Sequence, residues 1–310
     1  MEKYYHSVKL DKDKCVGCTS CIKRCPTEAI RVRDGKASII AERCIDCGEC
    51  IRICPHYAKI AVTDMMSSIR AYKYKIALPA PALYGQFKRL QTVENVYTAL
   101  REIGFDEVYD VARGADIVTV ATRNYIEKNS GTVPKPLISS ACPTIMRLIQ
   151  VRFPTLLDNI LPLMAPMEVA AREARKAFCE AHYVKPEHVG VYFITPCAAK
   201  MTATHSPLGF EKSEVTGCLS MTEVYGMLSM QMARKKDADK TNKAPRIPQM
   251  PTPFGVGWAA AGGEAQALGA GNFLAVDGSK TINYPTWCFL KGWHALAAVW
   301  AGRSHLKINL

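Results

Sequence analysis

The sequence has no long apolar run. A membrane-spanning helix needs roughly 18 uncharged apolar residues, and no stretch of the 310-residue chain reaches that length. The segment Phe289–Gly302 is rich in apolar residues, but it is shorter and contains Lys291. The first residues, MEKYYHSVKLDKDK, lack the apolar segment of a signal peptide. We therefore expect a cytoplasmic protein with no membrane span.

Signatures of nucleotide and nucleic-acid binding are also missing. No Walker or Rossmann glycine pattern occurs. The formal net charge is +12, but no basic stripe is interleaved with aromatic residues, and the densest basic run, residues 234–236, suits a helix end. None of the seven histidines pairs with a cysteine or a carboxylate at ligand spacing. We expect neither a nucleotide cofactor nor a nucleic-acid partner.

Cysteine, in contrast, is abundant, with 13 residues. Eight of them form two runs of the pattern Cys-x-x-Cys-x-x-Cys-x-x-x-Cys-Pro, which begin at Cys15 and Cys44. Bacterial ferredoxins use this spacing to hold two [4Fe–4S] clusters, and the fourth cysteine of each run ligates the other cluster. The predicted ligands are Cys15, Cys18, Cys21 and Cys54 for the first cluster, and Cys25, Cys44, Cys47 and Cys50 for the second.

A zinc site and a disulfide framework are the alternatives to iron–sulfur clusters. Structural zinc sites use Cys-x-x-Cys pairs separated by a longer gap, and disulfides do not suit a reducing compartment. Gly17 and Gly48 permit tight loops, and Pro26 and Pro55 suit helix starts. Iron–sulfur clusters therefore fit the pattern best, and their oxygen sensitivity indicates an anaerobe.

An internal repeat with a spacing of 29 residues, from Cys15 to Cys44, divides the first part of the chain into two halves. Each half is predicted to supply a strand, a cluster loop, a helix and a strand. We expect an α+β ferredoxin-like domain over 1–63, a connector over 64–75, an α/β domain over 76–282 and a divergent tail over 283–310.

After Tyr74, apolar strands alternate with helical segments, which predicts βαβ units and a parallel sheet. The expected strands are 75–79, 105–112, 136–140, 188–195 and 214–218, and the expected helices are 86–104, 116–128, 143–152, 167–182 and 221–236. Two strands run into cysteine-containing segments, 139–144 and 195–200. Ligands of open α/β sheets bind at the carboxyl ends of such strands.

These two segments, preceded by the ferredoxin-type runs, resemble the signatures of the iron-only ([FeFe]) hydrogenase family. The chain reads Ser-Ala-Cys142-Pro and then Pro-Cys197-x-x-Lys200, and the stretch from Phe254 to Glu264 resembles a further shared segment. The resemblance implies that Cys142 and Cys197 bind the cubane of the active-site cluster and that Lys200 contacts its di-iron subsite. A third [4Fe–4S] cluster or a di-iron active-site cluster, and a redox partner protein, are implied in the same way.

The chain departs from the family pattern at three places. Ala141 stands where hydrogen-evolving members have a proton-relaying cysteine, and Ala203 stands where they have a glutamate. The last family signature, Cys-x-x-x-Cys, is missing after Asp277, where only Cys288 remains. The resemblance therefore implies a sensory or weakly active homologue, and it leaves open whether the chain is an enzyme.

Several alternatives stay open. Instead of a sensory homologue, the second domain could be a non-catalytic scaffold or a subunit through which electrons enter a larger redox complex. A third alternative is an iron–sulfur cluster assembly factor. The tail is a truncation, a frameshift or a natural divergent end. Cys142 and Cys197 have an alternative role as buried structural thiols, and Lys200 as a surface lysine. Cys179, Cys218 and Cys288 are expected as core thiols. For Cys218 and Cys288 the alternative is that they replace the missing ligands of the active-site cluster.

Overall fold

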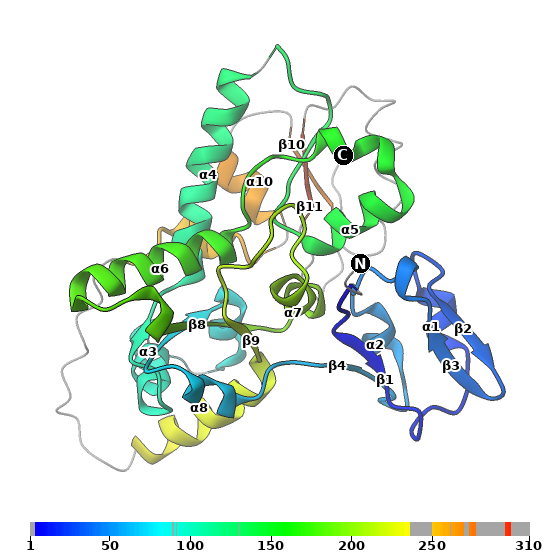
Figure 1. The fold of residues 1–310 in the computed structure, drawn as a ribbon, viewed down its shortest axis with the longest axis horizontal. Coiled ribbons are helices and arrows are strands. Elements are labelled where there is room, and N and C mark those ends of the chain that lie inside the picture. Colours follow the sequence, from blue (N-terminus) through cyan, green and yellow to red (C-terminus); the bar gives the residue numbers. More distant parts are fainter. Residues whose placement is uncertain are drawn as a thin grey trace.

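The computed structural model of the chain describes residues 4–88, 90, 92–129, 131–235, 250–260, 262–269, 273–276 and 295–298. Figure 1 shows a small lobe, which carries β1 to β4 with α1 and α2, beside a larger lobe that contains the remaining elements. The small lobe contains both cysteine runs, and the large lobe contains the α/β region.

The small lobe consists of two similar halves. Its elements are β1 (Val8–Leu10), α1 (Ser20–Arg24), β2 (Ile30–Arg33), β3 (Lys36–Ile39), α2 (Glu49–Ile53) and β4 (Lys59–Ala61). β1 pairs with β4 and β2 with β3, both antiparallel. Leu10 lies opposite Lys59 in one pair, and Ile39 lies opposite Ile30 in the other. The 29-residue repeat of the sequence is thus a structural repeat of strand, loop, helix and strand.

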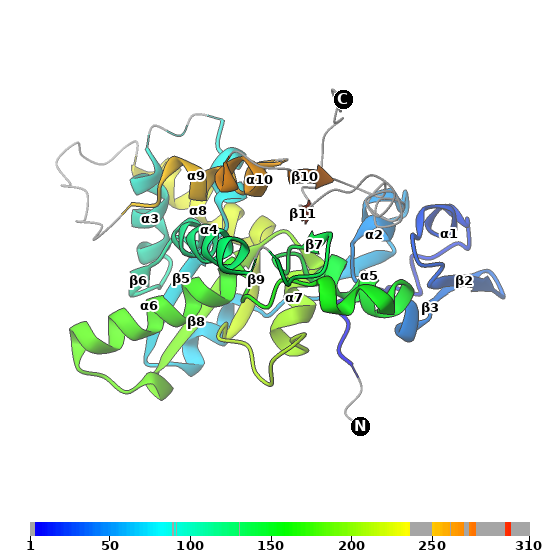
Figure 2. The same cartoon turned by 90° about the horizontal axis from the view of Figure 1, so that it is seen from above.

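A parallel four-stranded sheet with the order β6-β5-β8-β9 forms the centre of the large lobe. Its strands are β5 (Tyr74–Pro79), β6 (Glu107–Val108), β8 (Val189–Thr195) and β9 (Gly217–Ser220). Figure 2 shows α6 (Pro166–His182) on one face, and α3 (Val93–Glu102) and α8 (Met221–Lys235) on the other. Helices commonly cover both faces of a parallel sheet, and the predicted α/β region is confirmed.

The other part of the large lobe surrounds a parallel three-stranded sheet with the order β10-β11-β7. Its strands are β7 (Leu137–Ile138), β10 (Phe273–Val276) and β11 (Ala295–Ala298). The helices nearby are α4 (Val111–Lys128), α5 (Pro143–Arg152), α7 (Ala198–His205), α9 (Pro253–Gly257) and α10 (Gly263–Leu268). β7 and β8 are thus each followed by a cysteine that precedes a helix, Cys142 before α5 and Cys197 before α7.

The core of the large lobe is built around the central sheet. Ile76 and Leu78 of β5, Ile194 of β8 and Leu100 of α3 are fully buried. Burying one such side chain contributes about 1.5–3 kcal/mol. The strands of this sheet are continuous apolar runs because both faces are covered.

Several predicted elements have different limits in the structure. The helix predicted at 116–128 begins at Val111, the strand predicted at 214–218 is Gly217–Ser220, and the strand predicted at 136–140 is Leu137–Ile138. Two further elements differ more. The predicted strand 105–112 is only two residues long, because the side chain of Asp110 accepts a hydrogen bond from the Ala112 N–H (2.8 Å) and starts α4 at Val111. The predicted helix 86–104 begins only at Val93. A separate 3₁₀ segment, Pro81–Gln86, precedes it.

Helices α4 and α6 approach each other closely at Gly114. A Cβ atom at this position would overlap the carbonyl oxygen of Pro166 and lie 3.0 Å from the Ala170 Cβ. We expect Gly114→Ala to lower the free energy of unfolding by about 1–3 kcal/mol, because the added methyl group overpacks the helix contact. Thermal or urea unfolding of the purified protein measures this change.

Gly226 is the matched control for Gly114. It lies inside α8, and no atom lies within 4 Å of a Cβ built there. Gly226→Ala should raise the free energy of unfolding by about 0.5–1 kcal/mol, because alanine favours the helix. Equal effects of the two substitutions would contradict the described packing of α4 on α6.

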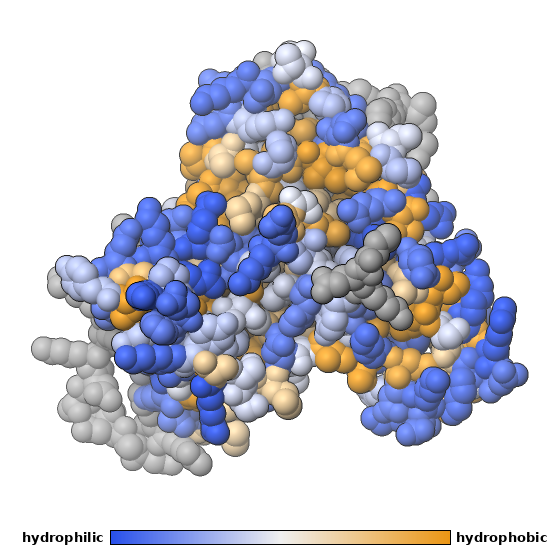
Figure 3. Space-filling view, viewed as in Figure 1, coloured by the Kyte–Doolittle hydropathy of each residue, from blue (hydrophilic) through white to orange (hydrophobic). Residues whose placement is uncertain are grey.

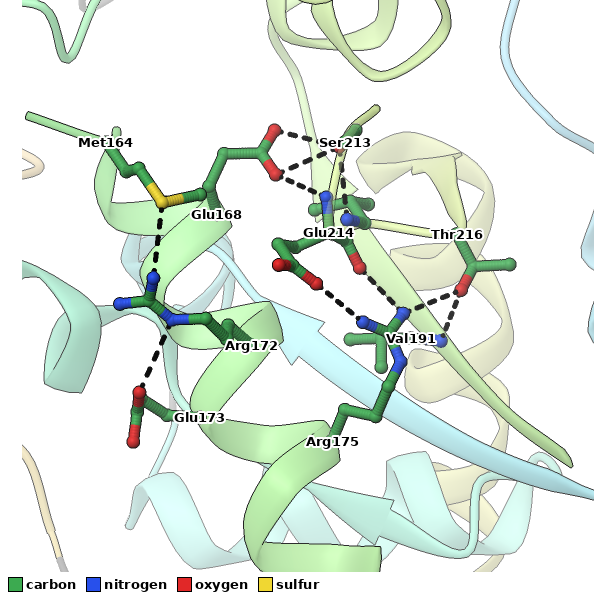
Figure 4. A network of polar contacts seen from close by, with 10 residues as sticks. Met164, Glu168, Arg172, Glu173, Arg175, Val191, Ser213, Glu214 and Thr216 are labelled. Atoms are coloured by element: carbon green, nitrogen blue, oxygen red, sulfur yellow. Dashed lines mark hydrogen bonds and ion pairs between the residues drawn. The ribbon is translucent and has the colours of Figure 1, made fainter. Parts of the chain in front are cut away.

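A buried carboxylate ties the segment before β9 to α6 (Figure 4). Glu168 is fully buried and accepts hydrogen bonds from the Ser213 hydroxyl (2.8 Å) and the Glu214 N–H (2.7 Å). Burial raises the pKa of Glu168, although these hydrogen bonds oppose the shift. Arg175, also of α6, donates to the Glu214 carboxylate (2.9 Å). The network fixes the connection from α7 to β9.

Among the residues that the structure describes, none of the helices combines the length and the apolar character that crossing a membrane requires.

Candidate metal centres

The eight cysteines of the two runs line two hollows in the small lobe. One contains Cys15, Cys18, Cys21 and Cys54, and the other contains Cys25, Cys44, Cys47 and Cys50. We call them the first and the second hollow. The structure brings together the two sets of four that the sequence analysis grouped, and iron ligation by these thiols stays a prediction.

The loops around the hollows depend on left-handed backbone positions. Gly17 has φ 69°, and its repeat equivalent Asp46 has φ 49°. A Cβ atom at position 17 would lie 2.7 Å from the Gly35 carbonyl oxygen, so only glycine fits the first loop. The fourth cysteine of each run also has an equivalent partner. The Ala29 N–H donates to Cys25 Sγ (3.1 Å), and the Ala58 N–H donates to Cys54 Sγ (3.3 Å).

Asp46 fastens the second loop to the start of the chain. Its carboxylate accepts a hydrogen bond from the Val8 N–H (3.1 Å) and lies 2.6 Å from His6 Nδ1. Cys44 Sγ lies within 4.8 Å of both side chains. Sequence spacing did not indicate this contact of His6. These residues are about 40 positions apart, and no sequence signal joins them.

Burial controls the acidity of the thiols in the second hollow. It raises the pKa of Cys44 and of Cys50 to about 12, and it raises that of Cys47 further. Cys15 of the first hollow differs, because the Ala37 N–H donates to its sulfur (3.4 Å) and lowers its pKa. Metal binding needs thiolates and releases their protons. Burial of Cys44 and Cys50 therefore opposes their deprotonation, and a bound cation would favour it.

Lys59 shows that the first hollow fits an anionic cofactor. It is 3% exposed and lines the first hollow beside the four cysteines. Among the described residues its Nζ has no hydrogen-bond partner. An unpaired buried ammonium costs several kcal/mol. Four thiolates around an iron–sulfur core carry a net negative charge, which offsets this cost. The orphaned ammonium and the four thiols therefore fit a [4Fe–4S] cluster.

A second group of predicted site residues meets in the large lobe. Cys142 is the N-cap residue of α5, and Cys197 is the N-cap residue of α7. Burial, with a smaller contribution from the charge of Cys197, raises the pKa of Cys142 to about 11, and the charge of Lys200 opposes this shift. Lys200 Nζ lies 5.7 Å from the centre of the Phe193 ring. The structure thus brings Cys142, Cys197 and Lys200 into one neighbourhood.

A buried acid lies on the same side of the large lobe. Glu264 of α10 is 2% exposed, and within the described part of the chain its Oε2 has no hydrogen-bond partner. Burial raises the pKa of Glu264 to about 7, against a hydrogen bond with Ser139 and the charge of Lys200. In the sequence, the stretch that ends at Glu264 stood out only by its resemblance to the family, and no signal gave this acid a role.

The remaining candidate positions have packing roles or fall outside the description. Cys218 is 1% exposed, and its Sγ lies 3.0 Å from the Thr204 hydroxyl. Cys179 of α6 is half-buried and packs against the main core. Ala141 packs in an apolar cluster that contains Trp258. Ala203 is 6% exposed, and Cys288 lies outside the described residues.

The two groups of cysteines are neighbours through the second run. Ile45, between Cys44 and Cys47, is 3% exposed and belongs to the same apolar core as Cys142. Cys47 packs against that core as well. On the other side, the Ser7 hydroxyl donates to the carbonyl oxygen of Ala198 (2.7 Å), the residue after Cys197. The second cysteine run thus packs beside Cys142, and the segment before β1 contacts the start of α7.

An ion pair joins the segment after β4 to the end of α7. His205 Nε2 lies 3.4 Å from Asp64 Oδ2, which also accepts the Cys218 N–H (2.7 Å). The hydrogen bond with Asp64 raises the pKa of His205. Burial would raise the pKa of Asp64, but His205 and the Cys218 N–H outweigh it, and the net shift is downward.

We expect His205→Gln to destabilise the protein mainly at acidic pH. A raised folded pKa means that His205 stabilises the fold fully below its unfolded value of about 6.5, and that this contribution is lost as the pH rises through the folded value. Asp64 contributes above its unfolded value of about 3.9. Urea unfolding of both proteins from pH 5 to 9 should show the largest difference at pH 5 and none at the alkaline end. A difference independent of pH would contradict the ion pair.

Comparison with known proteins gives two family matches. The family model described as "4Fe-4S dicluster domain" matches residues 7–55. The model described as "Iron only hydrogenase large subunit, C-terminal domain" matches residues 73–289. The first match covers both cysteine runs up to Pro55, and the second covers Cys142, Cys197 and Lys200.

Two curated relatives are hydrogenases by name. The periplasmic [Fe] hydrogenase large subunit of Nitratidesulfovibrio vulgaris is 30% identical over 212 residues, which is 63% of this chain and 50% of the relative. Iron hydrogenase 1 of Clostridium pasteurianum is 25% identical over 227 residues, 65% of this chain and 40% of the relative. The chain thus spans half or less of the length of these two proteins.

A solved structure, an apo [FeFe]-hydrogenase variant from Chlamydomonas reinhardtii, aligns with a TM-score of 0.45 and 18% identity. The alignment covers 52% of this chain and 43% of that chain.

Proposed function

Because this chain belongs to the family of iron-only hydrogenase large subunits, we propose that it is an electron-transfer protein with two [4Fe–4S] clusters beside a hydrogenase-type site at Cys142 and Cys197. The dicluster match over residues 7–55 supports the clusters. We further propose that hydrogen turnover at this site is weak, as in a sensory member of the family, because the relay position is Ala141.

We assign residues 1–63 to a ferredoxin-like α+β domain, 64–75 to a connector and 76–282 to the hydrogenase-type α/β domain. The paired strands and equivalent loops of the small lobe support the first assignment. The proposed ligands are those of the two hollows: Cys15, Cys18, Cys21 and Cys54 for the first cluster, and Cys25, Cys44, Cys47 and Cys50 for the second.

Each cluster, when bound, supplies a one-electron couple. The residues of the chain hold and tune it. The N–H groups of Ala29 and Ala58 donate to cysteine sulfur, and such hydrogen bonds are among the factors that set a cluster potential. Burial in the second hollow keeps water away from two of its thiols, Cys44 and Cys50.

The packing of Ile45 and Cys47 against the core of Cys142 is the observation that carries the proposed direction of electron flow. Electrons leave the second hollow toward the Cys142–Cys197 pair, because this hollow is its neighbour. They reach the small lobe at the first hollow, where Cys18 and Val16 are exposed. Figure 3 shows hydrophobic patches bordered by hydrophilic side chains on the small lobe, a mixture that suits a redox partner.

At the hydrogenase-type site, the chain offers two cysteines and a lysine. Cys142 and Cys197 are proposed cubane ligands, and Lys200 is proposed to hold the di-iron subsite through its ammonium. Ala141 and Ala203 occupy the two positions where the family pattern has proton-relaying side chains, and their methyl groups carry no exchangeable proton. Proton delivery along that route is therefore missing.

A redox titration tests the proposed function. Anaerobically reconstituted protein should take up two electrons per chain from a low-potential donor and return them to an external acceptor. Electron paramagnetic resonance of the reduced sample should show two [4Fe–4S] centres. A protein that binds zinc in place of iron and takes up no electrons would contradict the proposal.

A further inference from the structure

The two hollows of the small lobe differ in charge, and the internal repeat shows where. Residues 29 positions apart occupy equivalent places, and Lys59 corresponds to Ile30. They begin β4 and β2 and are 3% and 2% exposed. Their strand partners, Leu10 and Ile39, correspond as well. A buried ammonium therefore stands where the other half has a hydrocarbon side chain.

Lys59 lines the first hollow, and Ile30 lines the second. The lysine is buried, and its Nζ has no hydrogen-bond partner among the residues described. After the larger effect of the Ala37 N–H, its charge helps to lower the pKa of Cys15. Burial raises the pKa of Cys21 in the first hollow and of Cys50 in the second, and the charge of Lys59 lowers both pKa values in part. The charge acts on both hollows, but the side chain lines only the first.

The second hollow has acidic side chains in its wall. Asp46 and Glu49 line it and are 2% and 4% exposed. Their charges are partly balanced, because Asp46 contacts His6 and Glu49 pairs with Arg52. In the described structure no lysine or arginine lines this hollow. The electrostatic environment thus favours added negative charge in the first hollow over the second.

We propose that Lys59 makes the first cluster the easier of the two to reduce. An electron from a one-electron carrier adds one negative charge to the cluster, and a buried cation stabilises that charge because little water screens it. The inference rests on the proposed electron transfer through two clusters. In half-reduced protein the electron resides on the first cluster, beside the exposed Cys18, and its transfer to the second cluster is uphill.

The test is a redox titration of the reconstituted full-length chain, followed by electron paramagnetic resonance. In the wild type, the reduction equilibrium constant of the first cluster should exceed that of the second at least tenfold, which is about 59 mV for a one-electron couple. Lys59→Met should lower the constant of the first cluster at least tenfold and that of the second by less. A Cys18→Ser variant identifies the signal of the first cluster, because only that cluster uses this thiol.

Two control variants separate a buried charge from a surface charge. Lys59→Arg keeps the cation and should change both constants less than twofold. Lys23→Met removes an exposed cation two residues from Cys21, and water should keep its effect below twofold. A Lys59→Met protein with about eight iron atoms and unshifted potentials would overturn the inference.

If the Lys59→Met protein fails to assemble its clusters, the difference between the two wild-type reduction equilibrium constants tests the inference. Equal potentials of the two wild-type clusters would also overturn the role of Lys59. Failure of the proposed function has a different signature, because a wild-type protein without two reducible clusters would show neither potential.

Discussion

Hydrogen evolution by this chain, driven by reduced methyl viologen after maturation, is expected to be about 10²–10⁴-fold slower than that of a family member with the relay cysteine. A positioned proton donor contributes a factor of this size. The chain has Ala141 at the relay position, next to Cys142, and Ala141 packs in the apolar cluster of Trp258. Gas chromatography of evolved hydrogen measures the rate.

The cause of the slow rate is tested at the same position. Ala141→Cys should recover part of the rate, because it restores an exchangeable proton beside the site. Ala141→Ser has a similar size but a much less acidic group, so it should recover less. Turnover by the wild type as fast as that of relay-cysteine members would sink the proposal of a weak or sensory protein.

Replacement of Cys50 by alanine is expected to remove one of the two clusters and to lower the iron content by about four atoms per chain. Cys50 is buried among the thiols of the second hollow, where burial raises its pKa to about 12. The loss should also lower the stability of the small lobe, because metal binding energy is part of its folding energy. Iron analysis and thermal unfolding of the reconstituted variant measure both effects.

Cys179→Ala is the matched control for this experiment. Cys179 lies on α6, packs against the core of the large lobe and lines neither hollow. The variant should keep its full iron content and its reducible centres. Equal iron in the Cys50 and Cys179 variants would contradict the predicted ligand set.

The cluster loops were predictable because their signal is local. Three cysteines of each run lie within seven residues, and the 29-residue repeat already implies two equivalent halves. The same repeat also places Lys59 at the position equivalent to Ile30, a difference in charge that is already visible in the sequence. Burial and the lack of a partner give this lysine its meaning, and only the structure supplies them.

Features that depend on distant contacts were not predictable. His6 meets Asp46 across 40 residues, and Ile45 joins the same apolar core as Cys142 across almost a hundred. Strand limits were missed for a related reason. The apolar character of 105–112 predicted a long strand, but capping by the Asp110 side chain begins a helix there. Cys142 and Cys197 were found from their sequence context, and their proximity required the fold.

The most direct test of the central claim is the metal content of the wild-type chain after anaerobic reconstitution, measured together with the spectrum of the reduced protein. Two four-cysteine hollows that hold [4Fe–4S] clusters predict at least about eight iron atoms per chain, no stoichiometric zinc and two reducible centres in the small lobe. A cubane at Cys142 and Cys197 would add about four iron atoms. About two zinc atoms per chain, or fewer than four iron atoms, would contradict the claim that this chain carries electrons through two clusters.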